Sequence, residues 1–195
     1  MAISYPLNTP TTIGIESITL RAVNATVASQ SPFTFKQQVI AHQGQKWEAS
    51  VSIPSSRRDL SADWVALVVA MKGQVGSFLL GDPDYVTPRG TVSSCVVTGT
   101  AGDGTVSVVM TGTLKAGDYI QLGAGSSARL HKVLVDKNGT GDLEIWPDLR
   151  STYSSVAAVT NSPKGVFRLS QNVNEWSINN ASAYGISFEA VEVIL

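Results

Sequence analysis

The amino-acid sequence predicts a mainly β protein with one α-helix. Residue types that favour strands and tight turns, above all Val, Ile, Thr and Gly, are spread along all 195 residues, and only 15% of the residues are charged. Apolar and polar residues alternate in several short segments, which is typical of half-buried strands. One segment instead spaces its apolar residues as a helix does. Together these observations favour short strands joined by tight turns around a single helix.

The clearest strand is predicted at residues 46–53, where odd-numbered residues are apolar and even-numbered residues are polar. This alternation places one face of the strand in the core and the other in solvent. An upstream segment repeats the pattern with Phe33, Phe35, Val39 and Ala41. The segment 41–45 is predicted to form the hairpin loop between these two strands.

The spacing of apolar residues changes between residues 54 and 73 and predicts a helix at about residues 59–72. Its apolar stripe consists of Leu60, Trp64, Leu67, Val68 and Met71. We expect this stripe to pack on the sheet that contains Trp47 and Val51, because a lone helix needs an apolar surface to cover. Residues that suit the ends of this helix are Ser55, Ser56 or Asp59 as N-cap, and Lys72 and Gly73 as the C-terminal stop.

Residues 81–84, Gly-Asp-Pro-Asp, interrupt the strand pattern and predict a domain boundary. The segment 90–150 then holds short β runs separated by glycine-rich turns, which is typical of a small barrel or sandwich. The runs are residues 92–97, 106–110, 119–122, 130–135 and 143–146. The chain is therefore predicted to contain one domain of residues 1–85 and 160–195 and an inserted module of residues 86–159. Its last strand, at about residues 186–194, is expected to pair inside a sheet.

The charge balance argues against specific nucleic-acid binding, because Lys plus Arg total 14, Asp plus Glu total 15, and the net charge is −1. No stretch approaches the roughly 20 apolar residues of a membrane span, and the N-terminus lacks the features of a secretory signal. We therefore expect a protein made in the cytoplasm, without a membrane span. Its single Cys95 excludes an intramolecular disulfide.

Residues with catalytic or metal-binding chemistry do not form a recognisable motif. His42 and His131 lie outside any local catalytic signature, and Cys95 sits in an apolar run typical of a small buried residue. The segment 136–144 begins like a calcium loop, but a Pro stands where a bidentate Glu should close it, and an Asn-Gly hairpin turn explains the same residues. We therefore predict no enzyme activity and no catalytic, cofactor-binding or metal-binding residues.

Several segments carry a family resemblance when they are read in order. The first are residues 31–38 (SPFTFKQQ), 47–54 (WEASVSIP), Trp64 on the predicted helix, and 76–83 (GSFLLGDP). The later ones are residues 114–118, 130–133, 143–150, 167–169, Trp176 and 188–192. In this order they resemble the distal tail proteins of long-tailed, siphophage-like bacteriophages, including the small β insertion found in one branch of them.

The resemblance implies a β-sandwich-like, ring-forming domain that carries a small β-barrel-like module, residues 86–159, facing outward. It implies a structural viral protein that forms a homo-oligomer, a hexameric ring, at the tail tip or baseplate of the virion. The implied partners are the tail-tube protein and the tail-tip hub proteins, and the implied site of synthesis is the cytoplasm of the bacterial host.

A candidate self-association edge lies between residues 13 and 27, where apolar residues alternate among few charges. Its residues are Ile13, Ile15, Ile18, Leu20 and Val23. Simple core strands within one chain explain the same pattern equally well.

Two other functions fit the same sequence. The inserted module is a candidate for binding a host-surface glycan, and the aromatic residues to inspect for such a contact are Tyr119, Trp146 and Tyr153. Another tail component, such as a tube or terminator protein, is the second alternative, since these also use β-rich subunits.

Overall fold

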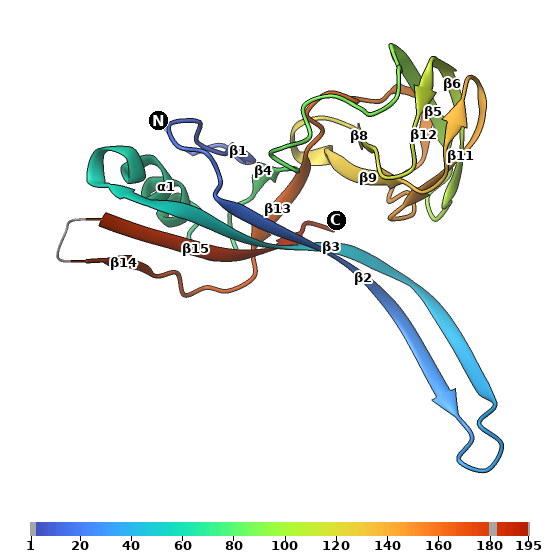
Figure 1. The fold of residues 1–195 in the computed structure, drawn as a ribbon, viewed down its shortest axis with the longest axis horizontal. Coiled ribbons are helices and arrows are strands. Elements are labelled where there is room, and N and C mark those ends of the chain that lie inside the picture. Colours follow the sequence, from blue (N-terminus) through green and yellow to red (C-terminus); the bar gives the residue numbers. More distant parts are fainter. Residues whose placement is uncertain (1–2, 180–182, 195) are drawn as a thin grey trace.

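The computed structural model describes residues 3–179 and 183–194. Figure 1 shows two lobes and a long two-stranded arm. The arm consists of residues 25–44. We use the name body for the other described residues in the ranges 3–80 and 165–194, and the name second lobe for residues 94–157. The described residues are mostly in strands, with one α-helix and a short 3₁₀-helix at Gly125–Ser127, so the predicted mainly β fold with one helix is confirmed. Among the described residues, no helix is both long and apolar enough to cross a membrane.

The body is built on one sheet that joins strands from both ends of the chain. The strand order is β1 (Leu7–Asn8), β4 (Phe78–Leu80), β13 (Gly165–Leu169), β15 (Ala183–Glu192), β3 (Gln37–Arg57) and β2 (Ser17–Gln30), and β14 (Trp176–Ile178) also pairs with β15. The β1–β4 pair is parallel, and the other described pairs in this sheet are antiparallel. The last strand, β15, lies between β13 and β3, so it pairs inside the sheet as predicted.

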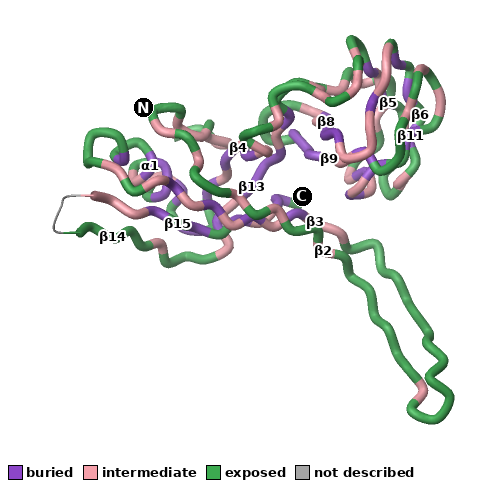
Figure 2. The backbone as a smooth tube through the Cα atoms, in the orientation of Figure 1, coloured by how far each residue is buried: buried purple, intermediate pink, exposed green. Residues whose placement is uncertain are grey.

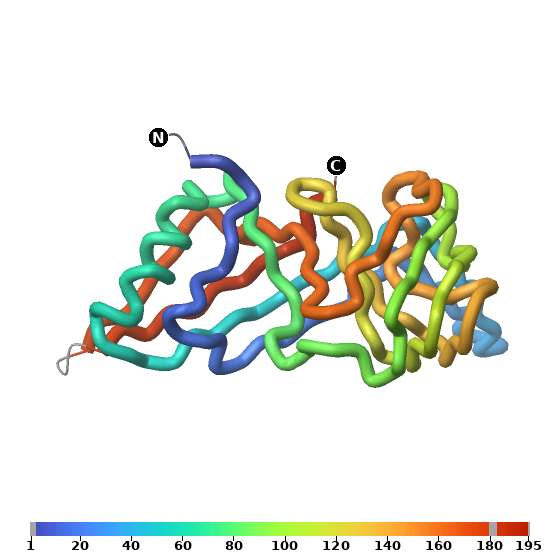
Figure 3. Tube along the Cα trace, turned by 90° about the horizontal axis from the view of Figure 1, so that it is seen from above, coloured from blue at the N-terminus to red at the C-terminus, as the bar shows by residue number. Residues whose placement is uncertain are grey.

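The helix α1 (Arg58–Ala70) covers one face of this sheet and contacts β15 and β3. Figure 3 shows α1 and the second lobe at opposite ends of the body. Trp64 is fully buried, its ring centre lies 6.2 Å from that of Phe188, and its indole N–H donates to the carbonyl of Ile13 at 3.0 Å. Because Trp47 and Val51 belong to the same core, the predicted packing of the helix on this sheet is confirmed.

The predicted stripe is wrong at Leu60, whose side chain is 40% exposed. Ser61 faces the sheet in its place, is fully buried, and makes hydrogen bonds with Ser56. A small hydroxyl residue fits here because β3 runs directly into the helix and leaves little space between them. Because β3 continues to Arg57, this residue is the N-cap of α1, and its side chain makes no capping hydrogen bond. None of the predicted capping residues fills that position.

The end of the helix follows the prediction more closely. The last helical residue is Ala70, and Lys72 and Gly73 have positive φ values of 51° and 69°. Such values terminate a helix, and the N–H of Gly76 then donates to the carbonyl of Met71 at 2.8 Å.

The predicted hairpin loop at residues 41–45 is wrong, because β3 continues without a break through this segment. The chain turns instead at residues 31–36, where the N–H of Ser31 donates to the carbonyl of Lys36 at 2.9 Å and Phe35 adopts a φ of 54°. Gly44 marks a bulge: three residues of β3, 42–44, lie opposite Ala25 alone. A glycine within a strand often marks a bulge and not a turn, which explains the misplaced loop.

The second lobe has its own sheet and its own core. Its strand order is β12 (Tyr153–Ala157), β5 (Ser94–Gly99), β6 (Thr105–Thr111), β11 (Gly141–Trp146), β9 (Arg129–Val133) and β8 (Tyr119–Leu122), and β7 (Thr113–Leu114) pairs separately with β10 (Lys137–Asn138). Each predicted run in this segment coincides with a strand to within one or two residues at its ends. The strand β12 has no counterpart among the predicted runs.

The two lobes meet through a shared core. Tyr119 and Leu130 of the second lobe belong to the core of the body, and the indole N–H of Trp47 donates to the carbonyl of Leu130 at 2.9 Å. Tyr85, on the connecting segment, packs edge-on against Tyr119 with ring centres 5.4 Å apart. The second lobe therefore packs firmly on the body, and the division at residues 86–159 stays a prediction.

Replacing Trp64 tests how much the helix depends on its buried face. We expect Trp64→Ala to lower the free energy of unfolding by about 3–5 kcal/mol, because it removes a fully buried ring and its hydrogen bond. Urea unfolding followed by circular dichroism measures this change. Val69→Ala, on the exposed face of α1, is the matched control and should cost less than about 1 kcal/mol. Equal losses for the two variants would contradict the packing described here.

Candidate assembly interface

An arm of residues 25–44 projects from the body and lies apart from the rest of the chain (Figures 1 and 2). Apart from the half-buried Ser31, every residue of the arm is exposed. Its large exposed apolar side chains are Val27, Phe33, Phe35, Val39 and Ile40. At the tip, Phe33 is 92% exposed and Phe35 is 73% exposed. Large apolar side chains gathered at such exposure mark a surface that contacts another molecule.

The composition of the arm indicates what kind of partner it fits. Lys36 is its single Lys, Arg, Asp or Glu, and apart from His42 the other residues are small, amide-bearing or apolar. A two-stranded hairpin is only marginally stable in water on its own, so the arm needs a further surface to cover it. An arm with a single charged residue and exposed apolar side chains suits a protein surface better than a polyanion.

The strand β2 forms one edge of the body sheet, and among the described strands only β3 pairs with it. It is 14 residues long, contains no Pro or Lys, and carries one charged residue, Arg21. Natural proteins usually protect exposed edges with such residues or with short strands. The long, unprotected edge of β2 is therefore available for pairing with another strand.

The candidate edge residues serve the core with their side chains. Ile13, Ile15, Ile18 and Leu20 are half-buried and pack against the core of the body, and Val23 is also half-buried. Ile13 and Ile15 precede β2, which begins at Ser17. The structure thus separates two roles that the sequence pattern merges: side chains facing the core, and a backbone edge facing outward.

The three aromatic candidates for glycan contact do not form an exposed platform. Tyr119 is 6% exposed and lies in the core of the body, with Lys132 Nζ 4.5 Å above its ring centre. Trp146 packs edge-on against Trp47 with ring centres 4.5 Å apart, and Tyr153 packs on the core of the second lobe. None of the three lines the cavity of about 390 Å³ between β15 and the segment 170–175.

The residues considered for catalysis or metal binding lie in different parts of the molecule. His42 is exposed at the bulge of the arm, and Cys95 is buried in the second lobe, where burial raises the pKa of its thiol to about 11. The side chain of Asp136 is held by Lys115 Nζ and the N–H of Ala116, at 2.9 and 2.8 Å. Among the described residues, no His, Cys, Asp and Glu side chains gather in a group suited to a metal ion.

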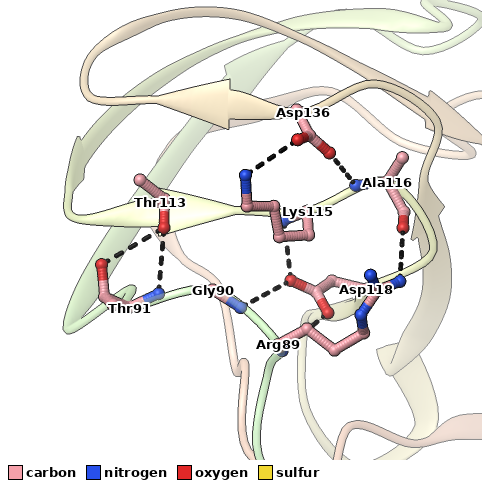
Figure 4. A network of polar contacts seen from close by, with 8 residues as sticks. All are labelled: Arg89, Gly90, Thr91, Thr113, Lys115, Ala116, Asp118 and Asp136. Atoms are coloured by element: carbon pink, nitrogen blue, oxygen red, sulfur yellow. Dashed lines mark hydrogen bonds and ion pairs between the residues drawn. The ribbon is translucent and has the colours of Figure 1, made fainter.

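A buried carboxylate fixes the segment that enters the second lobe (Figure 4). Asp118 is fully buried and accepts the backbone N–H groups of Lys115 at 2.8 Å, Arg89 at 2.8 Å and Gly90 at 3.3 Å. Three such donors satisfy a carboxylate that would otherwise be costly to bury. The sequence did not single out Asp118 as a buried contact, because the Gly117-Asp118 pair before a strand gives no sign of this long-range contact.

Comparison with known protein families finds no family model that matches this chain. The curated proteins likewise contain no significant match to it.

His131 supports the loop that follows β11. It is buried in β9, and its Nδ1 lies 2.7 Å from the carbonyl oxygen of Pro147. Burial lowers the pKa of His131 to about 4, with Arg150 and Arg129 also opposing its positive charge. The imidazole is therefore neutral at pH 7, and Nδ1 carries the hydrogen that it donates to Pro147.

The low pKa of His131 predicts a loss of stability in mild acid. In the unfolded chain this group titrates near its ordinary value of 6.5, so below pH 6.5 the unfolded state binds a proton that the folded state does not. We expect the free energy of unfolding to fall between pH 6.5 and pH 4, by at most about 1.4 kcal/mol per pH unit. Urea unfolding at a series of pH values measures this slope.

The control is His131→Gln, which keeps a donor for the carbonyl of Pro147 but does not titrate. Glu192 acts in the opposite direction, because burial raises its pKa and its contribution to stability grows as the pH falls. Since both proteins contain Glu192, the difference between their slopes isolates His131. Identical slopes for the two proteins would show that His131 does not have a lowered pKa.

Proposed function

We propose that this protein is a structural component that assembles with copies of itself through the arm and the outer edge of β2. The single observation that carries the proposal is the arm, which exposes Val27, Phe33, Phe35, Val39 and Ile40 and points away from its own body. The hydrogen bonds of residues 26–41 all lie within the arm, so no described part of the body covers it. Another chain is therefore the natural cover for it.

An arm that binds a neighbouring copy makes a contact between two different surfaces. Contacts of this kind give a ring when the rotation between copies closes and an open filament when it does not, whereas a contact of one surface with itself gives only a dimer. The edge of β2 adds a second means of contact, because a neighbouring strand can extend the sheet by backbone hydrogen bonds. Both features are compatible with a ring, which is the arrangement that we propose.

Within this class of proteins we propose the distal tail protein of a siphophage-like bacteriophage. The support is the ordered resemblance described above, in which the segment 31–38 forms the turn of the arm and the segment 47–54 forms the adjoining part of β3. The proposed assembly is a hexameric ring at the virion tail tip, between the tail-tube protein and the tail-tip hub proteins. The role is structural, without a catalytic step or a cofactor.

Charge substitutions on the arm test the proposed assembly. We expect the pair Val27→Glu and Ile40→Glu, whose residues are cross-strand partners, to weaken self-association by about 30-fold or more. Burying carboxylates in an apolar contact costs roughly 2 kcal/mol or more. Native mass spectrometry and sedimentation velocity measure the distribution of subunit number.

The matched control is Val109→Glu on β6, a residue with similar exposure on the second lobe, which should leave assembly unchanged. Because the arm lies outside the core, all variants should keep the wild-type circular dichroism spectrum and melting temperature. A wild-type protein that stays monomeric at high concentration, alone and with tail-tube protein, would falsify the proposal. Open stacks of variable length would favour a tube protein over a closed ring.

A further inference from the structure

The root of the arm is bound by the second lobe. Asn24 and Gln45 are the last cross-strand pair of β2 and β3 before the bulge. Trp146 Nε1–H donates to Asn24 Oδ1 at 2.8 Å, and the backbone N–H of Asp148 donates to Gln45 Oε1 at 2.7 Å. The guanidinium of Arg150 also donates to the carbonyl of Gln45. Both strands of the arm are thus held at the same level by one short loop, residues 146–150, which we name the clamp loop.

The strand ladder is interrupted immediately beyond the clamped pair. Pairing resumes only at Thr26 and Ala41, so Ala25 faces three residues of β3. A Cβ atom added to Gly44 would lie 2.9 Å from the Cβ of Ala25, so the two strands pass each other closely here. Bulges bend and twist a strand pair and weaken its ladder locally. This bulge is therefore the point at which the arm can change direction relative to the sheet.

Beyond the bulge the arm has no other support from the described chain. Every hydrogen bond recorded for residues 26–41 has its donor and acceptor within the arm, as in those of Gln30 with Phe35 and of Ser31 with Lys36. Nearly all of these residues are exposed. The direction of the arm is thus determined at its root.

The clamp loop is itself held rigidly by three elements. The ring of Trp146 packs on Trp47 of β3, and the carbonyl of Pro147 accepts from His131 of β9. Arg150 lies 3.6 Å from the carboxylate of Glu192 in β15, where both side chains are largely buried. A loop anchored in this way is suited to holding another segment in one position.

We propose that the clamp loop is a positioning device that sets the direction of the arm, with the bulge at Ala25 and residues 42–44 as its hinge. The arm is positioned by hydrogen bonds from Trp146, Asp148 and Arg150. The acceptors of these hydrogen bonds are Asn24 and Gln45 at the root of the arm. This consequence rests on the proposed self-assembly: the second lobe sets the angle at which one copy meets the next. A partner that displaces the clamp loop would then release the arm.

Distances between spin labels in the full chain test the clamp directly. One label goes on the arm tip through Thr34→Cys, and the other on the exposed face of α1 through Val69→Cys. Cys95 is buried, and a chain with Cys95 alone serves as the control for background labelling. The labelled protein is diluted with excess unlabelled protein, so that distances within one chain dominate.

The test variant combines Trp146→Phe, which keeps a ring against Trp47 but removes the indole N–H, with Gln45→Ala, which removes the side-chain acceptor of the Asp148 N–H. We expect the distribution of distances between the two labels to be at least two-fold wider than in the labelled protein that keeps Trp146 and Gln45. Trp176→Phe, at an exposed Trp on β14, is the matched control and should leave the width unchanged. Asn24→Ala, a milder change at the surface, should widen it to an intermediate extent.

An unchanged distribution in the folded double variant would overturn the clamp, as would a wild-type distribution already as broad as that of the variant. Melting temperatures confirm that each variant is folded. Sedimentation of the same proteins tests the consequence: clamp variants should assemble more weakly than wild type. If wild type does not assemble, the proposed function fails while the distance measurement still decides the clamp.

Discussion

The placement of the body, the second lobe and the arm depends on Trp47. This residue lies on β3 where the sheet of the body meets the arm, and it is bound on three sides. Its backbone N–H donates to Glu192 at 3.0 Å, its indole N–H donates to Leu130 at 2.9 Å, and Trp146 packs against its ring. One buried residue therefore joins β15, through its backbone N–H, and β9 and β11, through its side chain, to β3. Since a large ring in a close-packed core leaves a cavity when it is lost, this junction tolerates little change.

The junction also buries charged groups, and these add orientation more than stability. The Arg150–Glu192 pair is largely buried, and burial raises the pKa of Glu192 even though Trp47 and Arg150 donate to or attract its carboxylate. Removing two ions from water offsets most of their mutual attraction. An arrangement of the lobes that separates Arg150 from Glu192 leaves a buried charge without a partner, so few alternative arrangements are compatible with both charges. The same Arg150 also binds the root of the arm, and orientation of the lobes is thereby linked to orientation of the arm.

The two halves of β3 contribute to function in different ways. Between Trp47 and Ile53, alternate residues are buried and stabilise the body, whereas residues 37–44 are all exposed and add nothing to the core. Residues 37–41 pair only with the other strand of the arm among the described strands. The exposed end of β3, residues 37–44, presents unprotected strand to solvent, which costs solubility. Such a cost is compensated when the exposed half is covered by another chain, which is why the arm and the edge of β2 are the surfaces on which the proposed assembly rests.

The sequence by itself determined the β class, the single helix on its sheet and most strands of the second lobe, because these follow from local periodicity and turn residues. Local pattern also showed Trp64 and Cys95 as buried. It failed where partners are distant: Gly44 reads as a turn but lies in a bulge, Leu60 belongs to the apolar stripe but Ser61 faces the sheet, and Tyr119 suggested a sugar platform but completes the core of the body. The arm, the free edge of β2 and the clamp loop were decided only by tertiary structure, since a strand's exposure and the hydrogen bonds joining residues 24 and 45 to residues 146–150 depend on contacts across about 100 positions of the chain.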